Sequence, residues 1–227
     1  MIRTLLIVVL LSAPGTAQAE CRLAIALALD VSGSVDSRDY ALQRNGLAGA
    51  LRDPRVVQAI LARPETPVDL MVYEWSDQGS TRTILPWQAM TSANALESAT
   101  TRIETAPRAA MPPATALGDA MRHGIRSLAS RRCWQRTLDI SGDGRSNTGP
   151  RPGPLRAVAQ TNDITINALV IGHPDPSETT RLTAYFRANV ITGPGAFTET
   201  ARDFSNYKAA MTRKLLRELT QQAISMR

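Results

Sequence analysis

Apolar residues along this chain fall into short continuous runs separated by longer stretches of mixed polarity. None of the runs alternates apolar and polar positions cleanly, as a strand with one face in water would. Near-continuous apolar runs are typical of strands that are buried on both faces of a parallel sheet. Four runs have the length of a strand: Leu23–Leu29, Val68–Trp75, Thr137–Ile140 and Ile164–Ile171.

Two weaker segments complete the expected sheet. Thr81–Leu85 follows Val68–Trp75 after the turn-like residues 76–80. This spacing favours a hairpin, so we expect Thr81–Leu85 to be an antiparallel edge strand. A last strand is expected near Ala196–Thr200.

Helix-like stretches lie between the strands. Strands that alternate with helices predict an α/β fold: a doubly wound, mostly parallel central sheet with one antiparallel edge strand and helices on both faces. In such sheets ligands bind beyond the carboxyl ends of strands, near the point where strand order reverses. The expected helices are Ser37–Leu51, Ser92–Thr105, Ala116–Ser130, Pro154–Thr161, Glu178–Ala188 and Phe204 to about Ala223. The last helix has an apolar stripe that we assign to core packing, formed by Met211, Leu215, Leu216 and Leu219.

The first 19 residues have the features of an export signal. Arg3 supplies a positive charge, Leu5–Leu11 an apolar run, and Ala-Gln-Ala at positions 17–19 a cleavage pattern. The alternative, an uncleaved membrane anchor, is disfavoured because a spanning helix needs about 20 apolar residues. We therefore expect cleavage after Ala19, a single domain over residues 20–227, no transmembrane segment in the mature protein, and a periplasmic or secreted location.

Composition narrows the expected partners. The chain has 227 residues, of which 43% are hydrophobic, so it is long enough to bury a full core. Removing residues 1–19 would remove only Arg3 among the charged side chains, so the net charge of +6 would become +5. This balance favours acidic partners or an anionic surface. Arginines are scattered, with no basic block interleaved with aromatics, so we expect no binding to nucleic acid.

The two cysteines stand at matching distances from two aspartates. Cys21 lies nine residues before Asp30, and Cys133 lies ten before Asp143. If these aspartates end neighbouring parallel strands, the cysteines begin the same strands at the opposite edge of the sheet. Neighbouring strands lie about 4.8 Å apart, within the usual Cα separation of a disulfide, about 4.4–6.8 Å. In an oxidising compartment this predicts a Cys21–Cys133 disulfide.

Candidate chemistry begins where the first strand should open into a loop, at residues 30–34. Asp30, Ser32 and Ser34 stand at alternating positions in a turn that contains Gly33. Their oxygens can point at one spot, and such a cluster suits a hard divalent cation. Asp and Ser are also common in ordinary turns, so these residues alone leave both readings open.

Two later segments offer further oxygen ligands. Asp143 follows the run Thr137–Ile140 between two glycines, which places a carboxylate at the end of a strand. Thr115 stands at the start of an expected helix, after Pro-Pro-Ala at positions 112–114. An ordinary turn and a helix N-cap are the structural alternatives for these two residues.

Together the three segments resemble the metal-ion-dependent adhesion site (MIDAS) of von Willebrand factor type A (vWA) domains. In one respect the chain departs from the family pattern, because Pro-Pro-Ala replaces the glycines often found before the threonine, which would stiffen that loop. Residues 31–36, 73–76 and 140–144 also resemble an exported bacterial branch of these domains. The family's Asp-x-Ser-x-Ser matches Asp30, Ser32 and Ser34, its threonine matches Thr115, and its Asp-Gly matches Asp143-Gly144.

The resemblance implies a vWA/Rossmann-like sheet and a protein-binding module that is not an enzyme. The five matched side chains would hold the cation and leave a position open for an acidic side chain of a partner protein. Mg²⁺ fits such a set of oxygen ligands best, with Mn²⁺ and Ca²⁺ as alternatives.

Two other functions remain as alternatives. The first is a metal-free interaction module of the same fold. The second, less favoured, is a Mg²⁺-dependent phosphoester hydrolase. Against it, the Asp30-x-Ser32 pattern lacks the second aspartate of an Asp-x-Asp phosphatase loop, and His123 and His173 are not in a paired ligand spacing. The chain also has neither a nucleophile-elbow nor a Walker-type motif.

Several other residues have simpler interpretations. Asp36 and Asp39 should begin the first helix, where carboxylates favour the positive end of the helix dipole. Asp119 should be solvated and not a ligand. For Trp75 and Trp87, core packing is favoured over a role in a partner surface. Arg145 and Arg151 are placed to steer an acidic partner.

Overall fold

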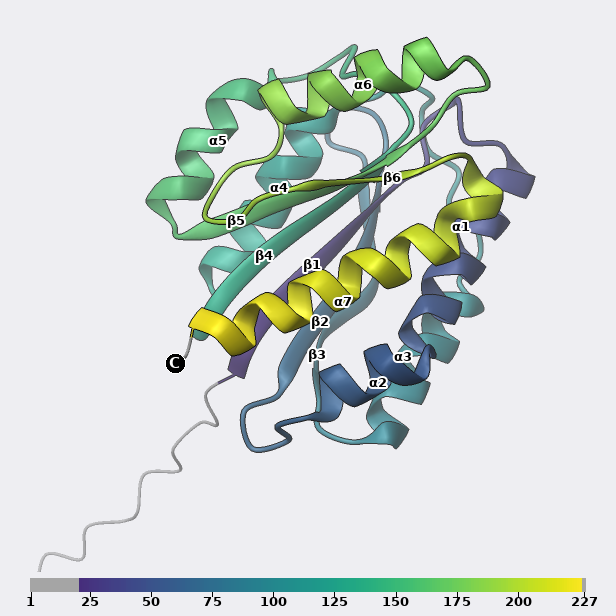
Figure 1. Ribbon diagram of the computed structural model, residues 1–227. Coiled ribbons are helices and arrows are strands. Elements are labelled where there is room, and N and C mark those ends of the chain that lie inside the picture. The colour runs from purple at the N-terminus through teal and green to yellow at the C-terminus, as the bar shows by residue number, and fades with distance from the viewer. Residues whose placement is uncertain (1–20, 226–227) are drawn as a thin grey trace, which may run out of the picture.

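The computed structural model describes residues 21–225, and the side chains of residues 21–220, as one sheet between two layers of helices (Figure 1). The export signal predicted over residues 1–19 lies outside the described residues. None of the helices in the described part of the chain has the length and hydropathy of a membrane span.

The sheet has six strands in the order β3-β2-β1-β4-β5-β6. All neighbouring strands are parallel except β2 and β3, which are antiparallel. The predicted fold class and the antiparallel edge strand are therefore confirmed. Strand order reverses between β1 and β4. The strands are β1 Cys21–Asp30, β2 Val68–Trp75, β3 Thr81–Met90, β4 Cys133–Gly142, β5 Ile164–Ile171 and β6 Thr198–Ala201.

Helices cover both faces of the sheet (Figure 1). One face packs against α1, α2, α3 and α7, and the other against α4, α5 and α6. The short helix α2 was not predicted; Asp53 caps it and Pro54 is its first residue. The helices are α1 Ser37–Leu51, α2 Pro54–Leu61, α3 Ala93–Glu104, α4 Leu117–Ala129, α5 Pro152–Thr161, α6 Pro176–Asn189 and α7 Tyr207–Ser225, with a 3₁₀ turn, η1 Phe204–Asn206, before α7.

Strand β1 is buried along its whole length. Its alternate side chains serve the two core layers: leucine and isoleucine face α1 and α7, and alanines at 24, 26 and 28 face α4. This explains why its sequence reads as one apolar run. The expected stripe on α7 is core packing, since Met211, Leu215 and Leu219 are buried and Leu216 is partly buried against the same cluster.

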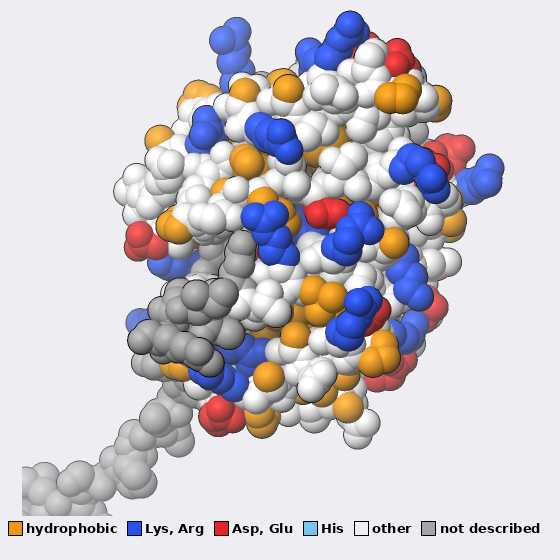
Figure 2. Space-filling model, viewed as in Figure 1, with side chains coloured by type: hydrophobic (Ala, Val, Ile, Leu, Met, Phe, Trp, Pro, Cys, Tyr) orange, Lys and Arg blue, Asp and Glu red, His pale blue; other side chains and the backbone are white. Residues whose placement is uncertain are grey.

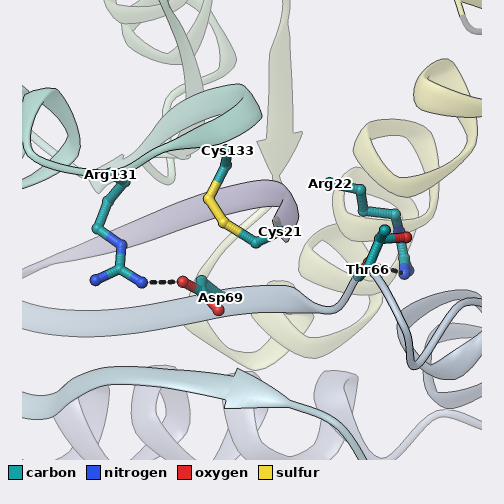
Figure 3. Close-up of a disulfide and its surroundings, with 6 residues drawn as sticks. All are labelled: Cys21, Arg22, Thr66, Asp69, Arg131 and Cys133. Carbon is teal, nitrogen blue, oxygen red and sulfur yellow. Dashed lines mark hydrogen bonds and ion pairs between the residues drawn. A yellow bond between two sulfur atoms is a disulfide. The ribbon is translucent and has the colours of Figure 1, made fainter. Parts of the chain in front are cut away.

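The predicted disulfide is confirmed. Cys21 and Cys133 are bonded, with their Cα atoms 4.7 Å apart. They are register partners at the starts of β1 and β4, the two strands on either side of the topological switch point. Figure 3 shows the disulfide beside the ion pair between Arg131 and Asp69. The bond therefore ties the two central strands at the edge opposite their carboxyl ends.

Candidate metal centre

The carboxyl ends of β1 and β4 bring the predicted ligands to one edge of the sheet. Asp30 is the last residue of β1, and Asp143 directly follows the last residue of β4. The strands are hydrogen-bonded neighbours up to the pair Leu29 and Ser141. The two carboxylates therefore lie at the point where an open α/β sheet binds ligands.

Hydrogen bonds link four of the five predicted ligands. The backbone N–H of Ser32 donates to Asp30 Oδ1 at 2.8 Å. Ser34 Oγ donates to Asp143 Oδ1 at 2.7 Å, and Ser32 Oγ lies 3.4 Å from Ser34 Oγ. The structure thus brings together Asp30, Ser32, Ser34 and Asp143, which are separated by up to 113 residues in the chain.

The segment carrying Thr115 packs against the same loops. Gly33 N donates to Pro113 O at 2.8 Å. Asn147 brackets Thr115: its Oδ1 accepts from Thr115 N at 2.8 Å, and its N–H donates to Thr115 O at 2.9 Å. The N-cap of α4 is Ala116, without a side-chain capping bond, so the N-cap alternative for Thr115 is wrong. Thr115 is buried beside the other two segments, and its hydroxyl does not cap the helix.

Several residues that shape this site had no signal in the sequence. Asn147 stands in a loop rich in Gly, Pro and Ser, where asparagine is ordinary. Gln43 Nε2 donates to Asp30 O at 2.9 Å, and Arg108 donates to Val35 O at 2.7 Å, so both hold the backbone of the first loop. Their roles depend on how distant loops meet, which no local pattern specifies.

Gly118 allows α4 to approach the loop after β4. A Cβ atom at this position would stand 2.0 Å from the backbone oxygen of Pro150. A backbone oxygen cannot move as the end of a flexible side chain can. The loop would therefore have to shift, and the two hydrogen bonds between Asn147 and Thr115 would shift with it.

We expect Gly118→Ala to destabilise the protein by about 1–3 kcal/mol, the usual cost of overpacking. Urea unfolding would measure the loss. Gly144→Ala is a matched control in the same region, because a Cβ there would have no neighbour within 4 Å. Equal stability of the two variants would show that the α4 contact is not tight.

Burial disfavours the charged form of the candidate carboxylate ligands when no cation is nearby. Asp30 is fully buried, and its pKa is raised to about 7, first by burial and then by the charge of Asp143, while hydrogen bonds from Ser32 oppose the shift. Burial also raises the pKa of Asp143. Asp30 Oδ2 has no hydrogen-bond partner among the described residues. A buried carboxylate with an orphaned oxygen, next to a second, partly buried carboxylate, is therefore electrostatically unfavourable by itself.

The donor set fits a hard divalent cation. Carboxylate and hydroxyl oxygens are the ligands of Mg²⁺, Mn²⁺ and Ca²⁺, whereas softer ions prefer sulfur or imidazole. The orphaned oxygen of Asp30 would gain a partner. A second cluster of metal-type side chains, Cys21, Asp69 and Cys133, lies at the other edge of the sheet. Its sulfurs are joined in the disulfide and its carboxylate pairs with Arg131, so it supplies no thiolate ligand.

Asp119 differs from its predicted role. It is buried, accepts a hydrogen bond from Gly79 N at 3.0 Å and pairs with Arg122. The expectation of a solvated side chain is therefore wrong: Asp119 ties the turn after β2 to α4. The prediction for the first helix is confirmed, because Asp36 is its N-cap and accepts from Asp39 N at 2.8 Å.

Basic and aromatic side chains flank the loop after β4. The guanidinium of Arg145 lies 5.6 Å from the ring centroid of Tyr185, whose hydroxyl accepts a hydrogen bond from Ser146 N at 3.3 Å. Arg151 lines a neighbouring pocket of about 450 Å³ between this loop and α6. Neither arginine forms an ion pair with another described residue. On the face shown in Figure 2, Lys and Arg side chains are dispersed and form no single patch.

Comparison with known families and curated proteins gives one match. A family model described as "Protein of unknown function (DUF1194)" matches residues 20–223. No curated protein sequence matches the chain.

Solved structures share the fold at low sequence identity. Proximal thread matrix protein 1 from the mussel byssus, in a structure with a zinc-occupied MIDAS motif, is 15% identical with a TM-score of 0.63 over 88% of this chain and 46% of its own. The pilus adhesin SpaC from Lactobacillus rhamnosus GG is 14% identical with a TM-score of 0.65 over 89% of this chain and 31% of its own.

A third structure is matched over nearly its full length. The vWF domain of the type V pili tip protein Mfa5 from Porphyromonas gingivalis is 9% identical, with a TM-score of 0.61 over 92% of this chain and 97% of its own. By contrast, this chain spans about half the length of the mussel structures. At these identities the likeness shows a vWA-like fold.

Proposed function

The chain belongs to the DUF1194 family, and from this premise and its vWA-like fold we propose that it is an exported binding module that engages a partner protein through a bound divalent cation. The residues that would hold the cation are Asp30, Ser32, Ser34, Thr115 and Asp143. Mg²⁺ suits this set best, with Mn²⁺ and Ca²⁺ as alternatives.

One observation carries the proposal: a buried carboxylate with an unpartnered oxygen lies within a cluster of oxygen donors at the switch point of the sheet. Asp30 and Asp143 would supply the charged ligands, while the hydroxyls of Ser32, Ser34 and Thr115 add neutral oxygens. When bound, the cation would supply an electrophilic position that attracts an anionic oxygen from outside the chain. The neighbouring loops would hold the ligands at fixed positions through the Ser32 and Asn147 hydrogen bonds.

The expected partner is a protein that presents an acidic side chain. The net charge, +6 for the full chain and +5 without residues 1–19, favours approach of an acidic surface. Arg145 and Arg151, in the loop that begins at Asp143, would steer such a surface toward the cation. The proposal makes no use of bond-breaking chemistry, and no arrangement described above favours a hydrolase.

Export to the periplasm or the cell exterior is part of the proposal. The signal-like residues 1–19 and the Cys21–Cys133 disulfide both support it, because disulfides persist in oxidising compartments. The domain would then comprise residues 20–227. Two of the structural relatives, SpaC and Mfa5, are described as a pilus adhesin and a pili tip protein.

Mg²⁺ should raise the melting temperature of the chelator-treated mature protein. A ligand that binds only the folded state stabilises it by about 2.7 kcal/mol at 100 times its Kd. Thermal unfolding with increasing MgCl₂ measures the effect, and NaCl at equal ionic strength is the control.

One observation favours the metal-free alternative, since the Ser34–Asp143 hydrogen bond holds the two loops together without an ion. That alternative predicts neither a thermal shift nor binding heat with Mg²⁺, Mn²⁺ or Ca²⁺. Such a result would remove the cation from the proposal and leave an interaction module of the same fold.

A further inference from the structure

The segment Tyr73–Ser76, at the end of β2, is buried but has no part in the proposed ligand set. Two of its side chains have clear structural partners. Tyr73 donates to Ala120 O at 2.7 Å, and Glu74 accepts from Tyr40 and Arg82 at 2.6 and 2.8 Å. The other two side chains differ: Trp75 Nε1 and Ser76 Oγ are buried and have no hydrogen-bond partner among the described residues.

Trp75 is the register partner of Asp30 across β1 and β2. Val31 N donates to Trp75 O at 2.9 Å, which continues the pairing past the end of β1. Side chains of paired residues point to the same face of a sheet, and neighbouring strands lie about 4.8 Å apart. The indole and the carboxylate therefore stand side by side on the α4 and α6 face.

Gly142 of β4 lies beside Asp30, one residue past the paired residues Leu29 and Ser141. A Cβ at Gly142 would stand 3.3 Å from Asp30 Oδ2 and 3.6 Å from Trp75 Cζ2. The third neighbour is Phe186 Cζ, at 3.3 Å. The unpartnered oxygen of Asp30 and the benzo edge of the indole, which adjoins Nε1, thus border one small space above a glycine.

A buried donor and a buried acceptor are both unpartnered at neighbouring positions. Leaving a buried polar group unsatisfied costs about 1–3 kcal/mol. Apolar packing explains the burial of the Trp75 ring system, but it does not offset the cost of the unsatisfied N–H. The pair therefore indicates a polar role for Trp75 at the Asp30 end of the site.

We propose that Trp75 is a positioning residue of the candidate cation site, and that its indole N–H supports the carboxylate of Asp30 in the orientation that binds the ion. The part of the inference that concerns the ion rests on the proposed function. The proximity of the indole to Asp30 rests on the strand register and on the shared space above Gly142, although Trp75 Nε1 and Asp30 Oδ2 are not hydrogen-bonded to each other in the structure. Groups that hydrogen-bond to the direct ligands of a metal often tune its affinity, and their loss typically lowers metal affinity by about 10–100-fold.

The indole N–H resonances of ¹⁵N-labelled protein test this directly. The chain has three tryptophans, so each gives one cross-peak, and Trp87→Phe and Trp134→Phe assign all three. Trp87 lies against the guanidinium of Arg131, and Trp134 stands near the start of β4. Saturating Mg²⁺ should move the Trp75 peak and leave the other two in place. In metal-free protein, Asp30→Asn should move the Trp75 peak as well.

Affinity supplies a second readout. Trp75→Phe keeps an aromatic ring in the core but removes the indole N–H together with part of the buried ring volume, and Mg²⁺ affinity should fall by about tenfold or more. Trp87→Phe should leave the affinity unchanged.

The outcomes separate the two proposals. A Trp75 peak that stays in place with Mg²⁺ and in Asp30→Asn, while Mg²⁺ still raises the melting temperature, would overturn the role of Trp75 and leave the cation site standing. No thermal response of the wild-type protein to Mg²⁺ would overturn the proposed function and the cation-positioning role. In that case the Asp30→Asn spectrum still decides whether the indole pairs with this carboxylate.

Discussion

Asp30→Asn should abolish the stabilisation by Mg²⁺ while leaving the metal-free protein at least as stable as the wild type. Asparagine keeps an oxygen that accepts from Ser32 N, so the loop retains its 2.8 Å hydrogen bond. It removes a buried charge beside Asp143, which is costly in the absence of a cation. A residue that lowers stability when its ligand is absent is characteristic of a binding site, not of a structural turn.

The same variant makes a pH prediction with a definite sign. The pKa of Asp30 is raised from 3.8 to about 7 in the folded protein, so the folded state holds this proton more tightly than the unfolded state. Its contribution to stability is therefore full below about pH 4 and is lost as the pH rises through about 7. Metal-free wild-type protein should lose stability over this window relative to Asp30→Asn. Buried acids that do not interact with Asp30, such as Asp139, contribute equally to both proteins and cancel in the difference.

Urea unfolding at a series of pH values, with and without Mg²⁺, measures both effects. Asp163→Asn is the control, because Asp163 is exposed and lies at the amino end of β5, away from the candidate ligands. A wild-type Mg²⁺ response that survives in Asp30→Asn would exclude Asp30 as a ligand.

Replacing both cysteines by serine should lower the free energy of unfolding by about 4–5 kcal/mol. The disulfide joins residues that are 112 positions apart. In the chain-entropy account, closing a loop of about 100 residues restricts the unfolded chain by about 4.7 kcal/mol. This is a large share of the stability of a typical domain, about 5–15 kcal/mol.

Unfolding of Cys21→Ser/Cys133→Ser is compared with that of the oxidised and the reduced wild-type protein. The reduced wild type should behave as the variant does, and reductant should not change the variant. Mg²⁺ affinity of the folded variant should be preserved, since β1 and β4 remain paired along their length up to the candidate site. A stability loss below about 1 kcal/mol would show that the disulfide adds little to a sheet that is already well packed.

The sheet was predictable because most of its strands are buried on both faces. β1, β2 and β5 read as apolar runs and match their predicted bounds closely. β4 was predicted four residues too short at its amino end, where the side chains of residues 133–136 are only partly buried or exposed. α2 was missed because eight residues give too short a periodic pattern.

The candidate site was predictable where ligands directly follow strands. Asp30, Ser32, Ser34 and Asp143 are such residues, and the structure brings them together. Asp119 was misjudged because it accepts a hydrogen bond from Gly79, forty residues away, a contact that the sequence of its own helix does not reveal. For Trp75 the burial was expected. Its position next to Asp30 was not, because that position depends on the register of β2 against β1.

Most of these predictions depend on a divalent cation held at the carboxyl ends of β1 and β4. Crystals of the mature protein grown with Mn²⁺ and measured for anomalous scattering test for it most directly. We expect one strong anomalous peak at coordination distance from Asp30, Ser32 and Ser34, with Thr115 and Asp143 around it. Crystals grown at saturating Mn²⁺ that show no peak there, or that bind the ion only elsewhere, would contradict this expectation.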